Sequence, residues 1–64
     1  MTGHEVRRIR KRLGLSQAAL AKEVGVNVNS LARWERGELG IRESAAKLMR
    51  RLLDERTQQP ARRR

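Results

Sequence analysis

The sequence predicts an all-α domain of four helices, or at most five, from three features. Apolar residues recur at intervals of three and four, the spacing at which side chains share one face of an α-helix. A glycine follows each of the first three such segments, where helices commonly end. No segment shows the alternation of apolar and polar residues that is typical of a half-buried strand. We therefore expect a small helical domain without a sheet.

The first helix is expected between Thr2 and Gly14. Thr2 and Glu5 have the spacing of a capping box, in which each side chain accepts a hydrogen bond from the other residue's backbone N–H. Apolar residues at helical spacing follow, and Gly14 ends the segment. This apolar stripe consists of Val6, Ile9 and Leu13.

Two shorter helices follow, separated by only a few residues. Ser16 can cap the second helix, which Gly25 ends, and Asn27 can cap the third, which runs over residues 27–36 to Gly37. The second helix has one apolar stripe made of Leu20, Ala21 and Val24. The short connection predicts that these two helices pack as a pair.

The fourth and longest helix is expected over residues 43–55, with a core-facing stripe of Ala45, Leu48, Met49 and Leu52. The sequence RTQQPARRR that follows has no apolar stripe and contains the chain's one proline. We therefore divide the chain into a helical domain, residues 1–56, and a disordered basic tail, residues 57–64.

The charge of the chain favours a nucleic-acid partner. Its 64 residues include 16 Lys and Arg against 7 Asp and Glu, a formal net charge of +9, and 13 of the 16 are Arg. Guanidinium groups pair bidentately with phosphates and with guanine edges. The alternative is a solvated basic face that serves solubility alone.

Composition argues against an enzyme, a metal site and a membrane protein. The chain has no Cys, and His4, its single His, lies in the first turn without paired carboxylates around it. We therefore expect no catalytic residue, no metal and no cofactor. No apolar run approaches the ~20 residues of a membrane span or resembles a signal peptide. These features predict a soluble, cytoplasmic protein associated with the nucleoid.

The third helix divides into two faces. At ~100° per residue, Val28, Trp34 and Glu35 lie within roughly 60° of the core-facing Leu31. Three polar residues lie more than roughly 130° away and point outward. They are Asn29, Arg33 and Arg36.

Glu35 is unusual because an unpaired carboxylate on a core-facing side would cost several kcal/mol. The same construction on the first helix turns Arg10 inward beside Ile9 and Leu13. We therefore predict a partly buried ion pair between Arg10 and Glu35. The alternative is that both side chains lie at the rim of the core and contact water.

Residues 17–36 resemble the phage-repressor (XRE) helix-turn-helix family, and the similarity extends to about residue 55. The run LGLSQAALAKEVGV, followed by SLARWERGE, has a small Ala21 where the helices touch, Gly25 at the turn, and WERG at the end of the third helix. The resemblance implies a lambda-repressor-like helix-turn-helix domain whose 27–36 helix enters the DNA major groove. In this family an Arg of the first helix commonly pairs with the Glu that Glu35 matches.

The resemblance also implies roles for single residues. Val28, Asn29 and Arg33 match positions that face bases, and Gln17 matches one that grips a phosphate. The third helix is similar as well to the DNA-binding half of MqsA-type antitoxins, in which an Asn and an Arg four residues later read bases. The chain lacks the Cys-bearing zinc domain of those antitoxins. The other residues expected to contact phosphates are Asn27, Ser30, Arg36, Arg62, Arg63 and Arg64.

These features predict a small transcriptional regulator, a repressor that binds a palindromic operator as a homodimer. Four apolar residues have no evident use inside the domain, and in this family the corresponding region joins subunits on DNA. They are Leu39, Ile41, Ala46 and Leu53. Two alternatives remain: an antitoxin-type interaction module that also binds a protein such as a toxin, and a sequence-neutral nucleic-acid-binding protein.

Overall fold

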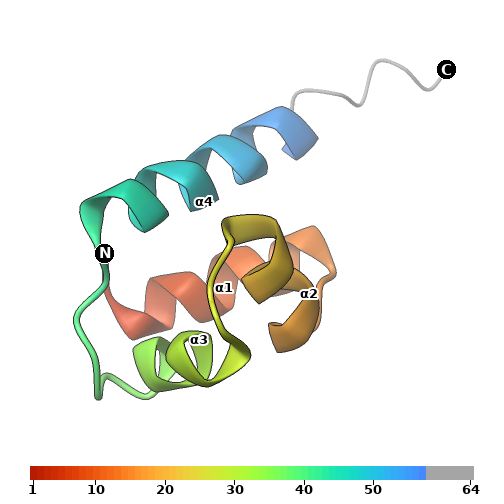
Figure 1. The fold of residues 1–64 in the computed structure, drawn as a ribbon. Coiled ribbons are helices and arrows are strands. Elements are labelled where there is room, and N and C mark those ends of the chain that lie inside the picture. Colours follow the sequence, from red (N-terminus) through yellow and green to blue (C-terminus); the bar gives the residue numbers. More distant parts are fainter. Residues whose placement is uncertain (58–64) are drawn as a thin grey trace, which may run out of the picture.

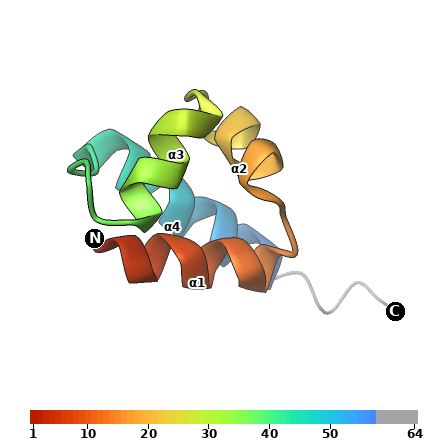
Figure 2. The ribbon, with the colours of Figure 1, turned by 90° about the horizontal axis from the view of Figure 1, so that it is seen from below.

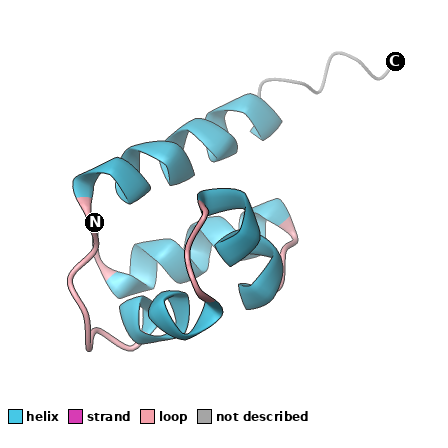
Figure 3. Cartoon of the chain, viewed as in Figure 1, coloured by secondary structure: helices cyan, strands magenta, loops and turns pink. Residues whose placement is uncertain are grey.

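The computed structural model describes residues 1–57, which form four helices and no strand. They are α1 (Gly3–Leu13), α2 (Gln17–Val24), α3 (Val28–Glu35) and α4 (Glu43–Thr57). Short loops join them, and the longest loop separates α3 from α4 (Figures 1 and 3). The predicted all-α, helix-turn-helix fold is confirmed.

Side chains cap the first three helices at the predicted residues. The backbone N–H of Thr2 donates to Oε1 of Glu5 at 2.9 Å, and the N–H of Glu5 donates to Oγ1 of Thr2 at 3.2 Å, which is the predicted capping box. The side-chain oxygens of Ser16 and Asn27 accept backbone N–H bonds at 3.1 and 2.8 Å. These bonds satisfy donors that have no partner inside a helix and so fix where α1, α2 and α3 begin.

Gly25 makes the turn between α2 and α3. Its φ of 82° is in the left-handed region, which residues with a side chain rarely adopt. The N–H groups of Gly25 and Val26 both donate to the carbonyl of Ala21, at 2.8 and 2.9 Å. The chain therefore leaves α2 abruptly and enters α3 within three residues.

The four helices enclose one apolar core. Helix α1 packs against α3 and α4, and α2 packs against the same two helices. Figure 2 shows α1 along one side of the domain, with α2 and α3 on the other. The buried side chains that form the core are Val6, Ile9, Leu13, Leu20, Ala21, Leu31, Trp34, Ala45 and Met49.

The first turn of α1 lies directly on the end of α3. A Cβ atom placed on Gly3 would collide with the backbone carbonyl oxygen of Trp34 and would lie 2.8 Å from that of Glu35. Atoms this close cannot coexist, so a side chain at position 3 would push α1 away from α3. Gly3 is therefore required by packing, a role that its place in the first turn of a helix does not reveal.

Three of the four residues predicted to face the core from α4 do so, and Leu48 is the exception. Ala46 is also buried, at 2% exposure, and Leu53 packs partly against the core, whereas Leu48 is half-buried without packing against it. Ile41, in the preceding loop, also packs partly against the core. The expectation that Ala46, Ile41 and Leu53 have no use inside the domain is therefore wrong. Leu39, at 39% exposure, is the member of that set that the fold leaves open to solvent.

The fourth helix also continues beyond its predicted end. Thr57 is its last residue, so the helix includes the first residue of the predicted tail. The rest of that predicted tail, with Arg62, Arg63 and Arg64, lies outside the described residues. Within residues 1–57, no helix combines the length and the apolar character needed to cross a bilayer.

Candidate nucleic-acid interface

The polar face of α3 is open to solvent, and the opposite face anchors the helix. Asn29 and Arg33 are exposed, while Leu31 is fully buried and Trp34 is 3% exposed. Val28 is 42% exposed, so the core-facing position that periodicity predicts for it is wrong. As the first residue of α3, Val28 lies where the core no longer covers the helix.

Glu38, in the loop after α3, lies beside two arginines of this face. The guanidinium of Arg36 donates two hydrogen bonds to the carboxylate of Glu38, from Nε at 2.9 Å and from Nη2 at 3.1 Å. Nε of Arg33 lies 3.9 Å from Oε1 of the same carboxylate. The hydrogen bonds from Arg36 lower the pKa of Glu38, and the bond to Glu38 raises the pKa of Arg36. The sequence pattern assigns no role to Glu38.

The predicted pair between Arg10 and Glu35 is present. Nε of Arg10 donates to Oε2 of Glu35 at 2.7 Å, Nη2 donates to Oε1 at 3.3 Å, and the two side chains are 16% and 7% exposed. Nη1 of Arg10 donates to the carbonyl of Leu15 at 3.1 Å. Arg10 therefore ties α1 both to α3 and to the loop before α2. The alternative, two separate side chains at the rim, is excluded.

Gln17 joins this pair from the first turn of α2. Its Nε2 donates to Oε1 of Glu35 at 3.2 Å. Burial would by itself raise the pKa of Glu35, but the hydrogen bonds from Arg10 and Gln17 outweigh it and hold the pKa below its ordinary value. A carboxamide nitrogen carries two hydrogens, and this bond uses one of them. The network thus fixes the amide of Gln17 beside α3.

Two further residues predicted to contact phosphates, Asn27 and Ser30, lie at the start of α3. Asn27 uses its side-chain oxygen to cap the helix, and Ser30 is half-buried one turn later. Both line a hollow of about 340 Å³ that Trp34 and Leu39 also border. The indole N–H of Trp34 is buried and has no hydrogen-bond partner within residues 1–57.

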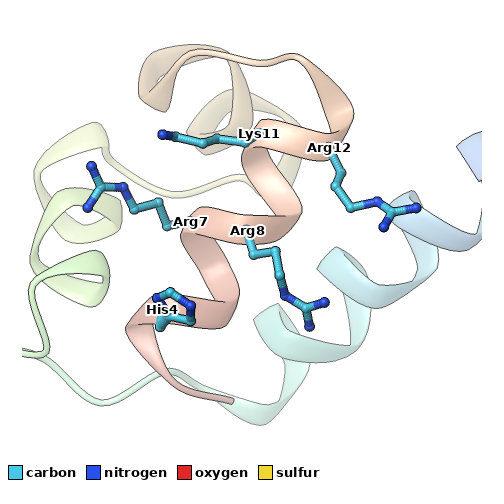
Figure 4. A pocket seen from close by; sticks show the side chains of 5 residues that line it. All are labelled: His4, Arg7, Arg8, Lys11 and Arg12. Atoms are coloured by element: carbon cyan, nitrogen blue, oxygen red, sulfur yellow. The ribbon is translucent and has the colours of Figure 1, made fainter.

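A second basic surface lies on α1. Five side chains line an open hollow of about 510 Å³, and they are His4, Arg7, Arg8, Lys11 and Arg12. Figure 4 shows Arg7 reaching toward α3, and Arg8 and Arg12 on the side of α4. No ion pair within residues 1–57 involves the four Arg and Lys side chains of this set. Arg7 and Lys11 are four residues apart, as are Arg8 and Arg12, and this spacing places like charges side by side on a helix. The sequence could have predicted this basic surface from that spacing.

The interface therefore combines an exposed polar helix face, a buried ion pair behind it and a large positive surplus. Within residues 1–57 no group of three His, Asp or Glu residues is placed to hold a metal ion. The predicted contacts Asn29, Arg33 and Arg36 lie on or directly after one helix. Gln17 approaches that helix from α2.

Comparison with known proteins assigns the chain to a family. A family model described as helix-turn-helix matches residues 6–58, most of the chain. No curated protein and no solved structure matches it. The match includes all of α2 and α3 and the turn at Gly25 that joins them. The chain therefore belongs to the helix-turn-helix family of phage-repressor (XRE) type, a family of DNA-binding regulatory domains rather than enzymes.

Proposed function

We propose that this DNA-binding regulator is a repressor that binds a palindromic operator as a dimer, with α3 in the major groove. The observation that carries the proposal is the exposed face of α3. Asn29 and Arg33 are one helical turn apart on that face, and the burial of Leu31 and Trp34 fixes the helix behind them. A rigid helix with two exposed hydrogen-bonding side chains can read neighbouring base pairs.

The two side chains suit different bases. An Asn amide can pair with N6 and N7 of adenine, and an Arg guanidinium can pair with O6 and N7 of guanine. We expect a half-site with an A and a G a few base pairs apart. Val28, exposed at the start of α3, is placed to contact a thymine methyl group.

Other residues supply contacts that hold the helix in place without reading sequence. Gln17 and Arg36 lie at the two ends of the helix-turn-helix pair, where phosphates flank a helix in the major groove. Asn27 and Ser30 complete this set from the start of α3. Arg62, Arg63 and Arg64 add positive charge from beyond the described residues. These contacts are proposed to set affinity rather than preference.

The exposed apolar side chain beside α3 supports the proposed dimer. Leu39 lies in the loop after α3, and Ile41 beside it is half-buried. A two-fold contact through this loop would place two copies of α3 in successive turns of the major groove, about 34 Å apart.

Val28 and Leu39 are the exposed large apolar side chains within residues 1–57. This leaves little apolar surface for the alternative role, in which a further protein such as a toxin binds.

Selection of bound sites from random duplex DNA tests the proposal. The expected result is an inverted repeat with half-site centres about one helical turn apart. Enrichment of a single, unrepeated half-site would contradict the dimer. The absence of any enriched sequence, together with steep salt dependence, would replace the proposal by sequence-neutral binding, which the basic surface of α1 favours.

A further inference from the structure

We infer that Glu38 is an internal competitor of the DNA and holds the affinity for the operator below what the basic residues of α3 would otherwise give. This inference rests on the proposed function, because it takes Arg33 and Arg36 as DNA-contacting residues. It assigns a role to a residue outside the predicted interface. The carboxylate of Glu38 occupies N–H groups of Arg36 that a phosphate would require, and it lies near the guanidinium of Arg33.

The backbone places Glu38 at the end of α3. Its backbone N–H donates to the carbonyl of Arg33 at 2.9 Å, which fixes the residue on the last turn of α3. From there its carboxylate accepts both hydrogen bonds from Arg36, at 2.9 and 3.1 Å. Nε of Arg33 is 3.9 Å from the same group. The carboxylate of Glu38 thus offsets one of the two positive charges of Arg33 and Arg36 and binds Arg36 directly.

Stability does not explain this arrangement. The side chains of Arg33, Arg36 and Glu38 are 51–57% exposed, and exposed ion pairs contribute little to folding. The partly buried pair between Arg10 and Glu35 already joins α1 to α3. Glu38 can therefore be altered with little effect on the fold, which makes its influence on binding measurable.

A phosphate must compete with Glu38 for Arg36. A carboxylate and a phosphate both accept the parallel Nε and Nη2 hydrogens of an Arg, so while Glu38 holds this pair, Arg36 cannot offer it to a phosphate. If Arg36 turns to a phosphate, Glu38 is left without a partner close to the charged backbone of the DNA. Its charge must then attract a cation from solution. This uptake offsets part of the counterion release that drives binding to DNA.

The competing interpretation is that Glu38 positions Arg33 for reading a base. A positioning residue and a competitor predict opposite results when the carboxylate is neutralised. Loss of a positioning residue weakens binding and flattens base preference. Loss of a competitor strengthens binding and leaves base preference unchanged, because the freed group adds a phosphate contact.

The test measures binding of Glu38→Gln to its selected operator over a range of salt concentrations. We expect affinity to rise about three- to tenfold near 0.1 M salt, and the slope of log affinity against log salt to steepen by up to ~0.9, the amount for one further phosphate contact. Glu55→Gln is the matched control. It makes the same change in charge and also removes an exposed ion pair, the one with Arg51 at 3.7 Å. This pair lies near the C-terminal end of α4, away from the loop that joins α3 to α4 (Figure 1).

The double variant Arg36→Ala with Glu38→Gln completes the experiment. If Glu38 competes through Arg36, Glu38→Gln should raise the affinity of the Arg36→Ala variant by much less than three- to tenfold. Unchanged or weaker binding by Glu38→Gln, or an equal gain in Glu55→Gln, overturns the inference. Either result leaves the proposed function intact so long as the wild-type protein selects a defined operator, whereas failure to select one would end the proposed function itself.

Discussion

The ion pair between Arg10 and Glu35 joins α1 to α3 through side chains that water scarcely reaches. Replacing either residue alone by Ala should lower the free energy of unfolding by ~3 kcal/mol, because the remaining charge stays buried without its partner. Replacing both by apolar residues of similar size should lower it much less. Denaturant unfolding of the double-mutant cycle measures this. Arg12→Ala, which removes an exposed Arg from the same helix, is the control, and single variants that are mild and additive would contradict the account.

Glu35 also predicts how stability depends on pH. Its pKa in the folded protein lies below the ordinary value of a glutamate, so the folded state releases its proton more readily than the unfolded state. The stabilisation is therefore complete above the ordinary pKa and is lost as pH falls through the lower, folded pKa. Unfolding measured from neutral pH to about pH 3 should show less acid destabilisation in Glu35→Gln than in the wild-type protein. Identical pH profiles would mean that Glu35 gains nothing from its partners.

Single residues differ in how far the sequence can predict them. The Arg10–Glu35 pair was predictable because two opposite charges each interrupt an apolar helical stripe. Helical periodicity missed the exposure of Val28, because an ideal helical wheel ignores where the core ends along the helix axis, whereas the family resemblance places Val28 at a base-facing position. Glu38 was missed because it lies in a loop, where no periodicity indicates the direction of a side chain.

Between elements, the contact of α1 with α3 depends on Gly3. Gly3→Ala should destabilise the protein by ~2 kcal/mol or more, because the added Cβ overlaps backbone atoms of Trp34 and Glu35 that cannot move independently. Gly40→Ala is the matched control, since a Cβ there meets no atom within 4 Å. Thermal unfolding of the two variants checks the prediction. Equal stability of both would show that α1 does not approach α3 so closely.

The helices themselves were predictable to within a few residues, for local reasons. Caps at Thr2, Ser16 and Asn27 and the turn at Gly25 are encoded by neighbouring residues, and the structure confirms them. The face that α4 turns to the core was predicted except at its two edges. Ala46 and Leu48 lie at opposite edges of the apolar face, so the packing of α1 and α2 against α4 decides that Ala46 is buried and Leu48 only half-buried.

For the whole molecule, the positive charge should determine how tightly the protein binds DNA but not which DNA sequence it prefers. Deleting residues 58–64 removes Arg62, Arg63 and Arg64, which follow the one proline. The slope of log affinity against log salt should fall by up to roughly one unit for each phosphate that these residues neutralise. The preferred sequence should not change, because contacts to phosphates carry no sequence information. A changed binding motif after the deletion would show that these residues read DNA directly.

Whether α3 reads bases can be measured with Asn29→Ala and Arg33→Ala on a panel of operators that differ by single base pairs, at one salt concentration. Each variant should lose ~1 to 3 kcal/mol of discrimination at its own position and little affinity for unrelated DNA. Gln17→Ala, a phosphate contact in this account, is the control and should weaken binding to every operator about equally. If Arg33→Ala instead lowers affinity uniformly and keeps the full preference profile, Arg33 grips the backbone and the base-reading role of α3 is wrong.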